Sequence, residues 1–278
     1  MDATQNDRTL GAQVAEQIEA APGAGFILVD GALCPMSRAP WLRHVPRIIV
    51  APRSSPQASS DALPYLLEIT AYVRALLKET VTLARESSGV TWLTSSLSGQ
   101  DLAVALSLRT EAVLPQNLPV FLRVADARVL PVILAVLSEA QRKSFFNVAS
   151  AWCYLDRQHE LAQLQLPKFC EERFSPPLVL TEAQEQALLK AAEPDAVLRL
   201  LATNDHEALE GLPTNKRHAF VVQQMDRAVQ WGLSEPVDIA LYCSIALTHG
   251  HDFDLQPAWS AKLQGLKLGR LTVAQLIS

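Results

Sequence analysis

Residues 118–152 constrain the fold of this chain most, because a strand-like run is followed by a charged turn and then by two helix-like segments. The first part is β-branched or aromatic: Val120, Phe121, Leu122 and Val124. Such a run predicts a buried strand over 118–124. Asp126 follows, and its carboxylate is expected to accept hydrogen bonds from the first turn of a helix. The apolar residues 130–137 predict that helix, which Pro131 allows only if the helix begins close to it, because proline has no N–H to donate.

A second helix is predicted directly after this one. Ser138 and Gln141 have the spacing of a capping box, in which each side chain bonds the other residue's backbone N–H. The helix would carry Phe145 and Phe146 toward the core. We therefore expect the rest of the chain to pack around the strand and these two helices.

The segments before and after this stretch alternate between strand and helix. Strands are predicted at 26–29, 48–51 and 90–94, helices at 8–20 and 100–111, and a hairpin at 149–154 with 160–166. This alternation predicts a mixed α/β fold whose N-terminal lobe, 1–166, holds a largely parallel or mixed sheet.

A change in composition predicts where this lobe ends. Residues 167–180 contain three prolines and two adjacent glutamates, which indicates a linker. Only helical patterns follow, so 181–278 is predicted to be a smaller, all-helical lobe of about five helices. Thr181 with Gln184 forms a second capping box, Pro194 is expected at the first position of a helix, and Ser234 is expected to cap another.

Charge and cysteine spacing exclude several classes of function. The net charge is −5 and there is no run of lysine and arginine, whereas nucleic-acid binding needs clustered positive charge. The four cysteines are far apart and lack the spacing of zinc or redox sites, so we expect buried, reduced thiols. The sequence has neither a signal-peptide pattern nor an apolar run long enough to cross a membrane, which predicts a cytoplasmic protein without membrane insertion.

Candidate chemical sites are few. Asp30 follows an apolar strand, but Ala32 stands where a metal-dependent phosphotransferase would need a second aspartate, so a residue of a strand-end turn is the simpler interpretation. The segment 249–254 contains four residues of metal-binding type, which we interpret as a solvated loop: His249, His251, Asp252 and Asp254. Arg123, Asp126 and Arg128 form a charged cluster that either binds an acidic partner segment or fixes the strand-to-helix turn by capping and ion pairing.

Residues 118–152 also resemble a known family. The residues that carry the resemblance are Arg123, Asp126, Arg128, Val129, Leu130, Leu137, Ser138, Gln141, Phe145, Phe146 and Trp152. Earlier in the chain, Leu28 to Ala32 and a set from Trp92 to Arg109 match as well, and Ala127 departs from the pattern where the family has proline. Together they resemble the adaptor (chaperone) domain that is encoded beside spike genes of bacterial type VI secretion systems, over about residues 24–155.

The resemblance implies a non-catalytic, cytoplasmic adaptor that binds a toxin effector protein and helps to load it onto a VgrG-type spike protein. It implies no catalytic residue, cofactor or metal, and Arg123, Asp126 and Arg128 are then the candidates for partner binding. The alternative is an α/β hydrolase or transferase that uses Asp30 or Asp126. The two hypotheses differ in whether either carboxylate lies in an open pocket or in a covered turn.

Overall fold

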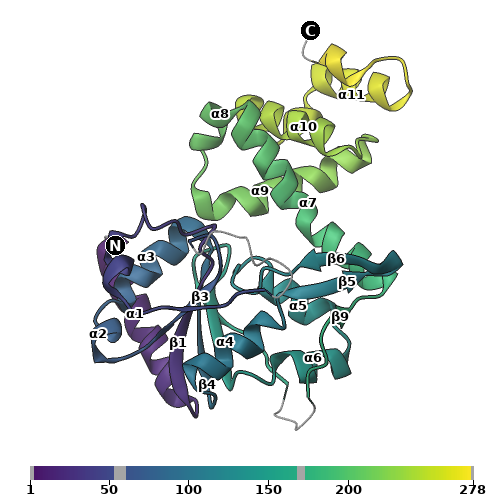
Figure 1. The fold of residues 1–278 in the computed structure, drawn as a ribbon. Coiled ribbons are helices and arrows are strands. Elements are labelled where there is room, and N and C mark those ends of the chain that lie inside the picture. The colour runs from purple at the N-terminus through teal and green to yellow at the C-terminus, as the bar shows by residue number, and fades with distance from the viewer. Residues whose placement is uncertain (1–2, 53–60, 168–172, 277–278) are drawn as a thin grey trace. The chain divides into compact units, whose positions relative to one another are not determined.

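The computed structural model describes residues 3–52, 61–167 and 173–276. The chain forms two compact units, Met1–Leu188 and Leu189–Ser278, each of which is described here by itself (Figure 1). Unit 1 contains all the strands of the described residues, and unit 2 contains helices. The predicted mixed α/β fold is confirmed.

Unit 1 is built on a six-stranded main sheet. In spatial order its strands are β2 (Ile48–Ile49), β3 (Tyr65–Glu68), β1 (Ala24–Val29), β4 (Val90–Ser95), β7 (Ala151–Leu155) and β8 (Leu161–Gln163). Every pairing in it is antiparallel across the described residues, including the predicted hairpin of β7 with β8. A largely parallel sheet was one of the two predicted options. The alternation of helices and strands in the sequence does not determine strand direction. After a connecting helix, the next strand can run parallel or antiparallel to the one before it.

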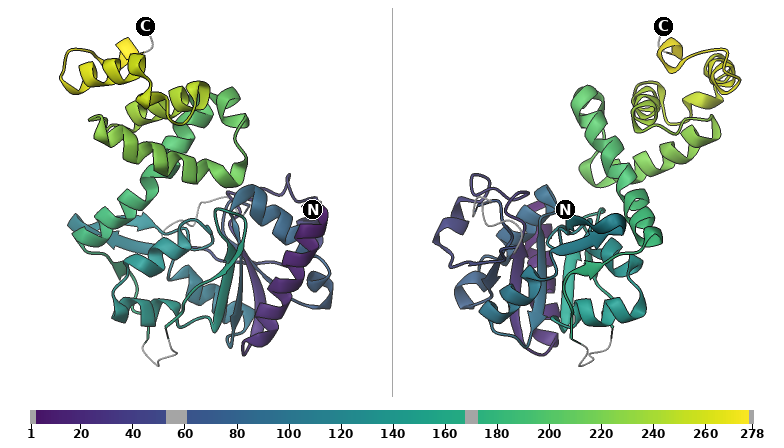
Figure 2. Two further views of the ribbon diagram at one scale, coloured as in Figure 1. Left: turned by 180° about the vertical axis from the view of Figure 1, so that it is seen from behind. Right: turned by 45° about the vertical axis from the view of Figure 1, so that its right-hand side comes forward.

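The two faces of the main sheet pack against different helices. Along β1, Phe26 and Leu28 point to one core while Ile27 and Val29 point to the other, because successive side chains of a strand alternate. The second of these faces is covered by α1 (Ala3–Ala20), α2 (Ala71–Arg74) and α3 (Leu77–Ser87). Figure 2 shows α1, in purple, lying along this sheet. Burial on both sides explains why the central strands are continuous apolar runs.

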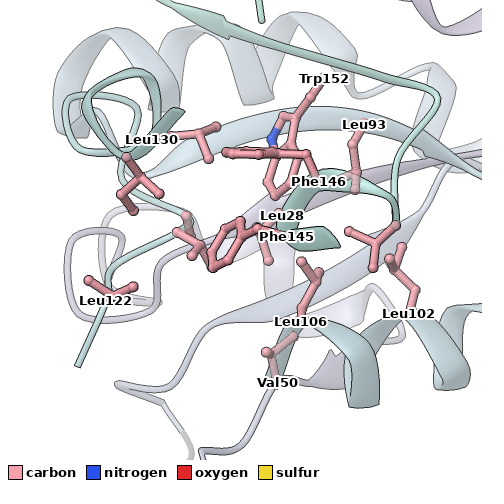
Figure 3. Close-up of a cluster of buried hydrophobic side chains, with 14 of the residues drawn as sticks. Leu28, Val50, Leu93, Leu102, Leu106, Leu122, Leu130, Phe145, Phe146 and Trp152 are labelled. Atoms are coloured by element: carbon pink, nitrogen blue, oxygen red, sulfur yellow. The ribbon is translucent and has the colours of Figure 1, made fainter. Parts of the chain in front are cut away.

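The other face holds the aromatic residues predicted to point inward. It is covered by α4 (Gly99–Ser107), α5 (Leu130–Val136) and α6 (Glu139–Phe146). Phe146 lies between Phe145 and Trp152, with ring centroids 5.0 and 6.1 Å away (Figure 3). As expected, α5 is short and begins next to Pro131, and α6 begins at a complete capping box.

A second, small sheet shows that part of the prediction for residues 118–152 was wrong. Its strands are β6 (Leu118–Phe121), β5 (Glu111–Leu114) and β9 (Leu178–Val179), in that order. The predicted buried strand over 118–124 is wrong, because β6 is an exposed strand at the edge of this sheet and only the residues after it, such as Leu122 and Val124, are buried. The predicted helix over 100–111 ends at Ser107, and its last predicted residue begins β5.

The two predicted capping boxes are both present and they bond to each other. Gln184 bonds the backbone N–H of Thr181, and its Nε2 donates to Oε1 of Gln141 at 2.6 Å. Gln141 Nε2 in turn donates to the carbonyl of Val179 at 2.9 Å. These bonds hold the first turn of α7 (Glu182–Asn204), which belongs to unit 1, against α6 and β9. Within the predicted linker 167–180, residues 168–172 lie outside the described residues, and Leu178–Val179 forms β9, which pairs with β5.

Up to residue 276, unit 2 contains the remainder of α7 and four further α-helices: α8 (His206–Glu210), α9 (Thr214–Gln230), α10 (Pro236–His249) and α11 (Pro257–Lys267). Pro194 lies inside α7 and does not begin a helix, and the N-cap of α10 is Glu235 instead of Ser234; both predictions were wrong. Gly232 follows α9 with φ +86°, a left-handed conformation that ends the helix at low cost only for glycine. None of the helices in the described part of the chain combines the length and apolar composition that a bilayer crossing requires.

Candidate functional site

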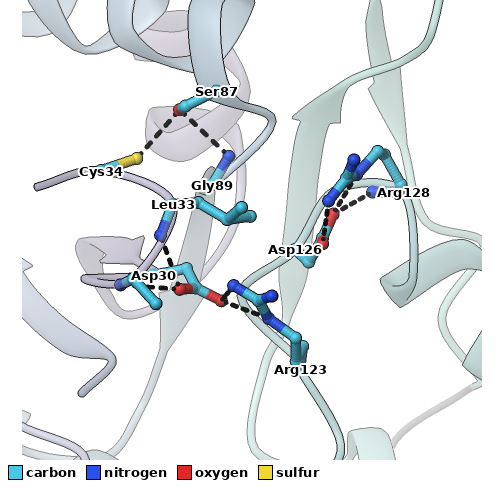
Figure 4. A network of polar contacts seen from close by, with 9 residues as sticks. Asp30, Leu33, Cys34, Ser87, Gly89, Arg123, Asp126 and Arg128 are labelled. Carbon is cyan, nitrogen blue, oxygen red and sulfur yellow. Dashed lines mark hydrogen bonds and ion pairs between the residues drawn. The ribbon is translucent and has the colours of Figure 1, made fainter. Parts of the chain in front are cut away.

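Asp30 lies in the turn that follows β1 and pairs with Arg123, which follows β6. Its Oδ1 accepts hydrogen bonds from the backbone N–H groups of Ala32 and Leu33, at 3.0 and 3.1 Å. Its Oδ2 accepts from Nε and Nη2 of Arg123, at 3.0 and 2.9 Å (Figure 4). Both carboxylate oxygens therefore have donors, and the pair connects the end of β1 to the segment after β6.

Asp126 pairs instead with a close neighbour in the sequence. Its Oδ1 accepts from the backbone N–H and from Nε of Arg128, at 3.0 and 2.9 Å, and its Oδ2 accepts from Nη2 at 2.7 Å (Figure 4). The carboxylate does not cap α5, whose N-cap is Val129; it is the carbonyl of Asp126 that accepts from the N–H groups of Val129 and Leu130. Asp126 thus stabilises the turn before the helix.

The predicted cluster of Arg123, Asp126 and Arg128 is therefore divided between two ion pairs. Nothing in the sequence indicated that Arg123 bonds Asp30, because the two residues are 93 positions apart. Both carboxylates are buried, while the side chains of Arg123 and Arg128 are 36% and 33% exposed. Each carboxylate lies in a covered turn and each guanidinium reaches the surface.

Arg109 is a buried cation that sequence reasoning left without a role. Its guanidinium donates to the carbonyls of Ala105, Ser144 and Phe145 and to the side-chain oxygen of Asn147, at 2.5 to 2.9 Å. Those carbonyls belong to the last turns of α4 and α6, where backbone oxygens lack helical partners and carry partial negative charge. Burial lowers the pKa of Arg109 to about 10, so the side chain remains charged at neutral pH. Arg109 holds the carboxyl ends of two helices together.

Unit 2 contains a second network that the sequence did not predict. Asp254 is buried, and its carboxylate accepts from Arg227, Trp231 Nε1 and Tyr242 Oη. Burial opposes ionisation of Asp254, but the hydrogen bonds from Arg227, Tyr242 and Trp231 outweigh it and hold the pKa of this carboxyl below its ordinary value. The hydrogen bond to Asp254 likewise raises the pKa of Arg227.

The four residues that were predicted to form a solvated loop make different contacts in the structure. His249 packs its ring on Trp259 and His251 packs on Phe220, while Asp252 and Asp254 both pair with Arg227. Asp254 is part of the core, so the interpretation as a solvated loop is wrong for that residue. Across 3–52, 61–167 and 173–276, no group of three or more His, Cys, Asp or Glu side chains is arranged to hold a metal ion.

Three buried cysteines agree with the expectation from their spacing. Cys34, Cys153 and Cys243 are free thiols within the described residues. Burial raises the pKa of each, to about 11 for Cys34 and to about 12 for Cys153 and Cys243. Because the thiolate is the reactive form, these side chains behave as apolar core residues at neutral pH.

Comparison with known proteins places the site inside one domain. No curated protein and no solved structure matches the chain. Residues 25–144 match a family described as "Domain of unknown function (DUF4123)". The matched segment contains Asp30, Arg109, Arg123, Asp126 and Arg128, so the Asp30–Arg123 pair, the Asp126–Arg128 pair and the buried arginine all lie in the part of the chain that resembles this family.

Proposed function

We propose that this protein is a non-catalytic adaptor of a type VI secretion system. In the cytoplasm it binds a toxin effector and helps to load that effector onto a VgrG-type spike protein. The resemblance of residues 24–155 to the adaptor domain supports the proposal, and the match of residues 25–144 to a domain family covers almost the same segment.

The observation that carries the proposal is the covered position of both candidate catalytic carboxylates. A general base or nucleophile needs at least one oxygen free to approach a substrate. Oδ1 and Oδ2 of Asp30 and of Asp126 all accept hydrogen bonds from backbone N–H groups or from an arginine. This arrangement supports a structural role for the two aspartates and leaves the arginines as the groups that a partner could contact.

Co-expression tests the proposal. The affinity-tagged chain, expressed with the products of the neighbouring effector and spike genes, is expected to retain the effector on the resin. It should also raise the effector's soluble yield, because binding to the folded form shifts the folding equilibrium by mass action. His249→Ala and His251→Ala alter exposed rings in unit 2 and are expected to leave retention unchanged.

An enzyme would give the opposite pattern. Asp30→Asn and Asp126→Asn keep the size of each side chain and its acceptor oxygen but remove the carboxylate. If the wild-type chain retained neither neighbouring product and showed a hydrolase or transferase activity that one of these variants abolished, the adaptor function would be overturned.

A further inference from the structure

We propose that the outer edge of β6, together with Arg123, binds an extended segment of the partner that carries a carboxylate. The inference rests on the proposed adaptor function and assigns that function a binding site. Three observations lead to it: the free edge of the small sheet, the exposed side chains along that edge, and an arginine held in place at its end.

The hydrogen-bonding pattern shows which backbone groups of β6 face outward. Leu122 N–H donates to the carbonyl of Thr110 at 2.7 Å, and Val120 lies opposite Ala112 in the antiparallel register with β5. Backbone groups of alternate residues point to opposite sides of a strand, so those of Pro119 and Phe121 point away from β5. Since β6 is at the end of the sheet order, no described strand pairs with that side.

Pro119 restricts what can bind at this edge. It has no N–H, so the edge offers the N–H and carbonyl of Phe121 and the carbonyl of Pro119. An added strand can therefore exchange a full pair of hydrogen bonds only at Phe121, which fixes its register. Proline at an edge strand also limits unspecific pairing.

The side chains of β6 favour an added strand over a partner that covers one face of the sheet. Leu118 and Phe121 are 55% and 45% exposed. They lie on opposite faces of β6, because their positions differ by an odd number. A strand added at the edge places its own side chains beside both residues, as in other cases of strand addition.

Arg123 is the reason why the bound segment is expected to carry a carboxylate. Two of its nitrogens, Nε and Nη2, are fixed by buried Asp30, while the side chain is 36% exposed and Nη1 has no partner among the described residues (Figure 4). A guanidinium held in this way can donate to a carboxylate without first losing side-chain freedom.

The test compares variants of the full chain by their affinity for the neighbouring effector that the wild-type chain retains. Phe121→Ala removes the side chain, whereas Phe121→Pro also removes the outward N–H, so the difference between them reports the backbone bond. Phe121→Pro is expected to bind several-fold more weakly than Phe121→Ala, up to about tenfold. Val179→Ala, which changes an exposed side chain of β9 at the other edge of the same sheet, is the matched control and is expected to stay within about twofold of wild type.

Arg123→Met removes the charge and keeps the apolar stem, and is expected to weaken binding by about tenfold or more. If this variant does not fold, because Asp30 has lost its partner, the double variant Asp30→Asn with Arg123→Met replaces the pair by neutral groups and carries the same expectation. Hydrogen exchange gives an independent measurement, since the amide of Phe121 should become protected in the complex.

The outcomes separate this site from the function on which it depends. If the wild-type chain retains the effector but the Phe121 and Arg123 variants bind within about twofold of it, or the Phe121 amide stays unprotected in the complex, the site is wrong and the adaptor function stands. If the wild-type chain retains no effector, the adaptor function is overturned together with the site.

Discussion

Units 1 and 2 each bury an aspartate against an arginine, but they bond it in different ways. In unit 1, Asp30 accepts two backbone N–H groups and a guanidinium that is 36% exposed. In unit 2, Asp254 accepts from the side chains of Arg227, Trp231 and Tyr242, and Arg227 is only 19% exposed. The carboxylate is buried in both units, whereas the arginine side chain is more exposed in unit 1 than in unit 2.

This difference indicates what each ion pair contributes. The network around Asp254 joins α9, α10 and the turn after α10 through side chains alone, so it stabilises the helical packing of unit 2. The Asp30 carboxylate fixes a turn and at the same time holds a cation at the surface. A partner could therefore use the charge of unit 1 without breaking the pair, whereas the charge of Arg227 is already shared between Asp252 and Asp254.

The largest expected effect is the loss of the Asp254 network. Asp254→Ala leaves Arg227, Trp231 and Tyr242 without their acceptor, and is expected to lower the free energy of unfolding by about 3 to 5 kcal/mol. Asp252→Ala is the control: that carboxylate is 73% exposed and pairs with the same arginine, so its loss should cost less than about 1 kcal/mol. Urea unfolding followed by tryptophan fluorescence measures both. Similar midpoints for the two variants would contradict the central role given to Asp254.

A smaller effect should separate the two aspartates of unit 1. Asp30→Ala removes the acceptor of two backbone N–H groups and of Arg123, and is expected to cost about 2 to 3 kcal/mol, because Arg123 can still be hydrated. Asp126→Ala removes only contacts with Arg128, two residues away, and should cost about 1 kcal/mol. Urea midpoints rank the two, and an equal or larger loss for Asp126→Ala would show that its turn matters more than the link between distant segments.

The smallest expected effect is the loss of stability at low pH through protonation of Asp254. The folded pKa of Asp254 lies below the ordinary value of 3.8, so its contribution to stability is complete above that value and is lost as the pH falls through the lower, folded pKa. As the pH falls below about 4, the urea midpoint should therefore fall less in Asp254→Asn than in the wild-type chain, because the variant has no carboxylate to protonate there. Parallel curves for the two proteins would assign the acid sensitivity to other groups.

Local signals in the sequence predicted much of the fold because they act within one turn of chain. Ser138 with Gln141 and Thr181 with Gln184 form the predicted capping boxes, and Gly232 ends α9. The runs 26–29 and 90–94 predicted strands, and the structure has β1 and β4 there. Each of these features depends on residues that lie within a few positions of one another in the sequence.

Local signals failed where a residue depends on distant partners. The apolar run at 118–124 predicts a buried strand, but among the described strands β6 pairs with β5 alone, and burial begins after the strand ends. Pro194 is tolerated inside α7, although local rules favour it at a helix start. In the candidate site, the sequence grouped Arg123 with Asp126 and Arg128, whereas the fold pairs Arg123 with Asp30.

Local patterns along the chain were therefore enough to predict most of its helices and strands, and an α/β part followed by a helical part. They did not predict that the main sheet is antiparallel, that β6 lies at an edge, or which partners Arg109, Arg123 and Arg227 have. The cause of this difference is distance along the chain. Caps and periodicity are local, whereas strand order and buried ion pairs depend on which distant segments fold against one another, and a single sequence carries no direct signal for that choice.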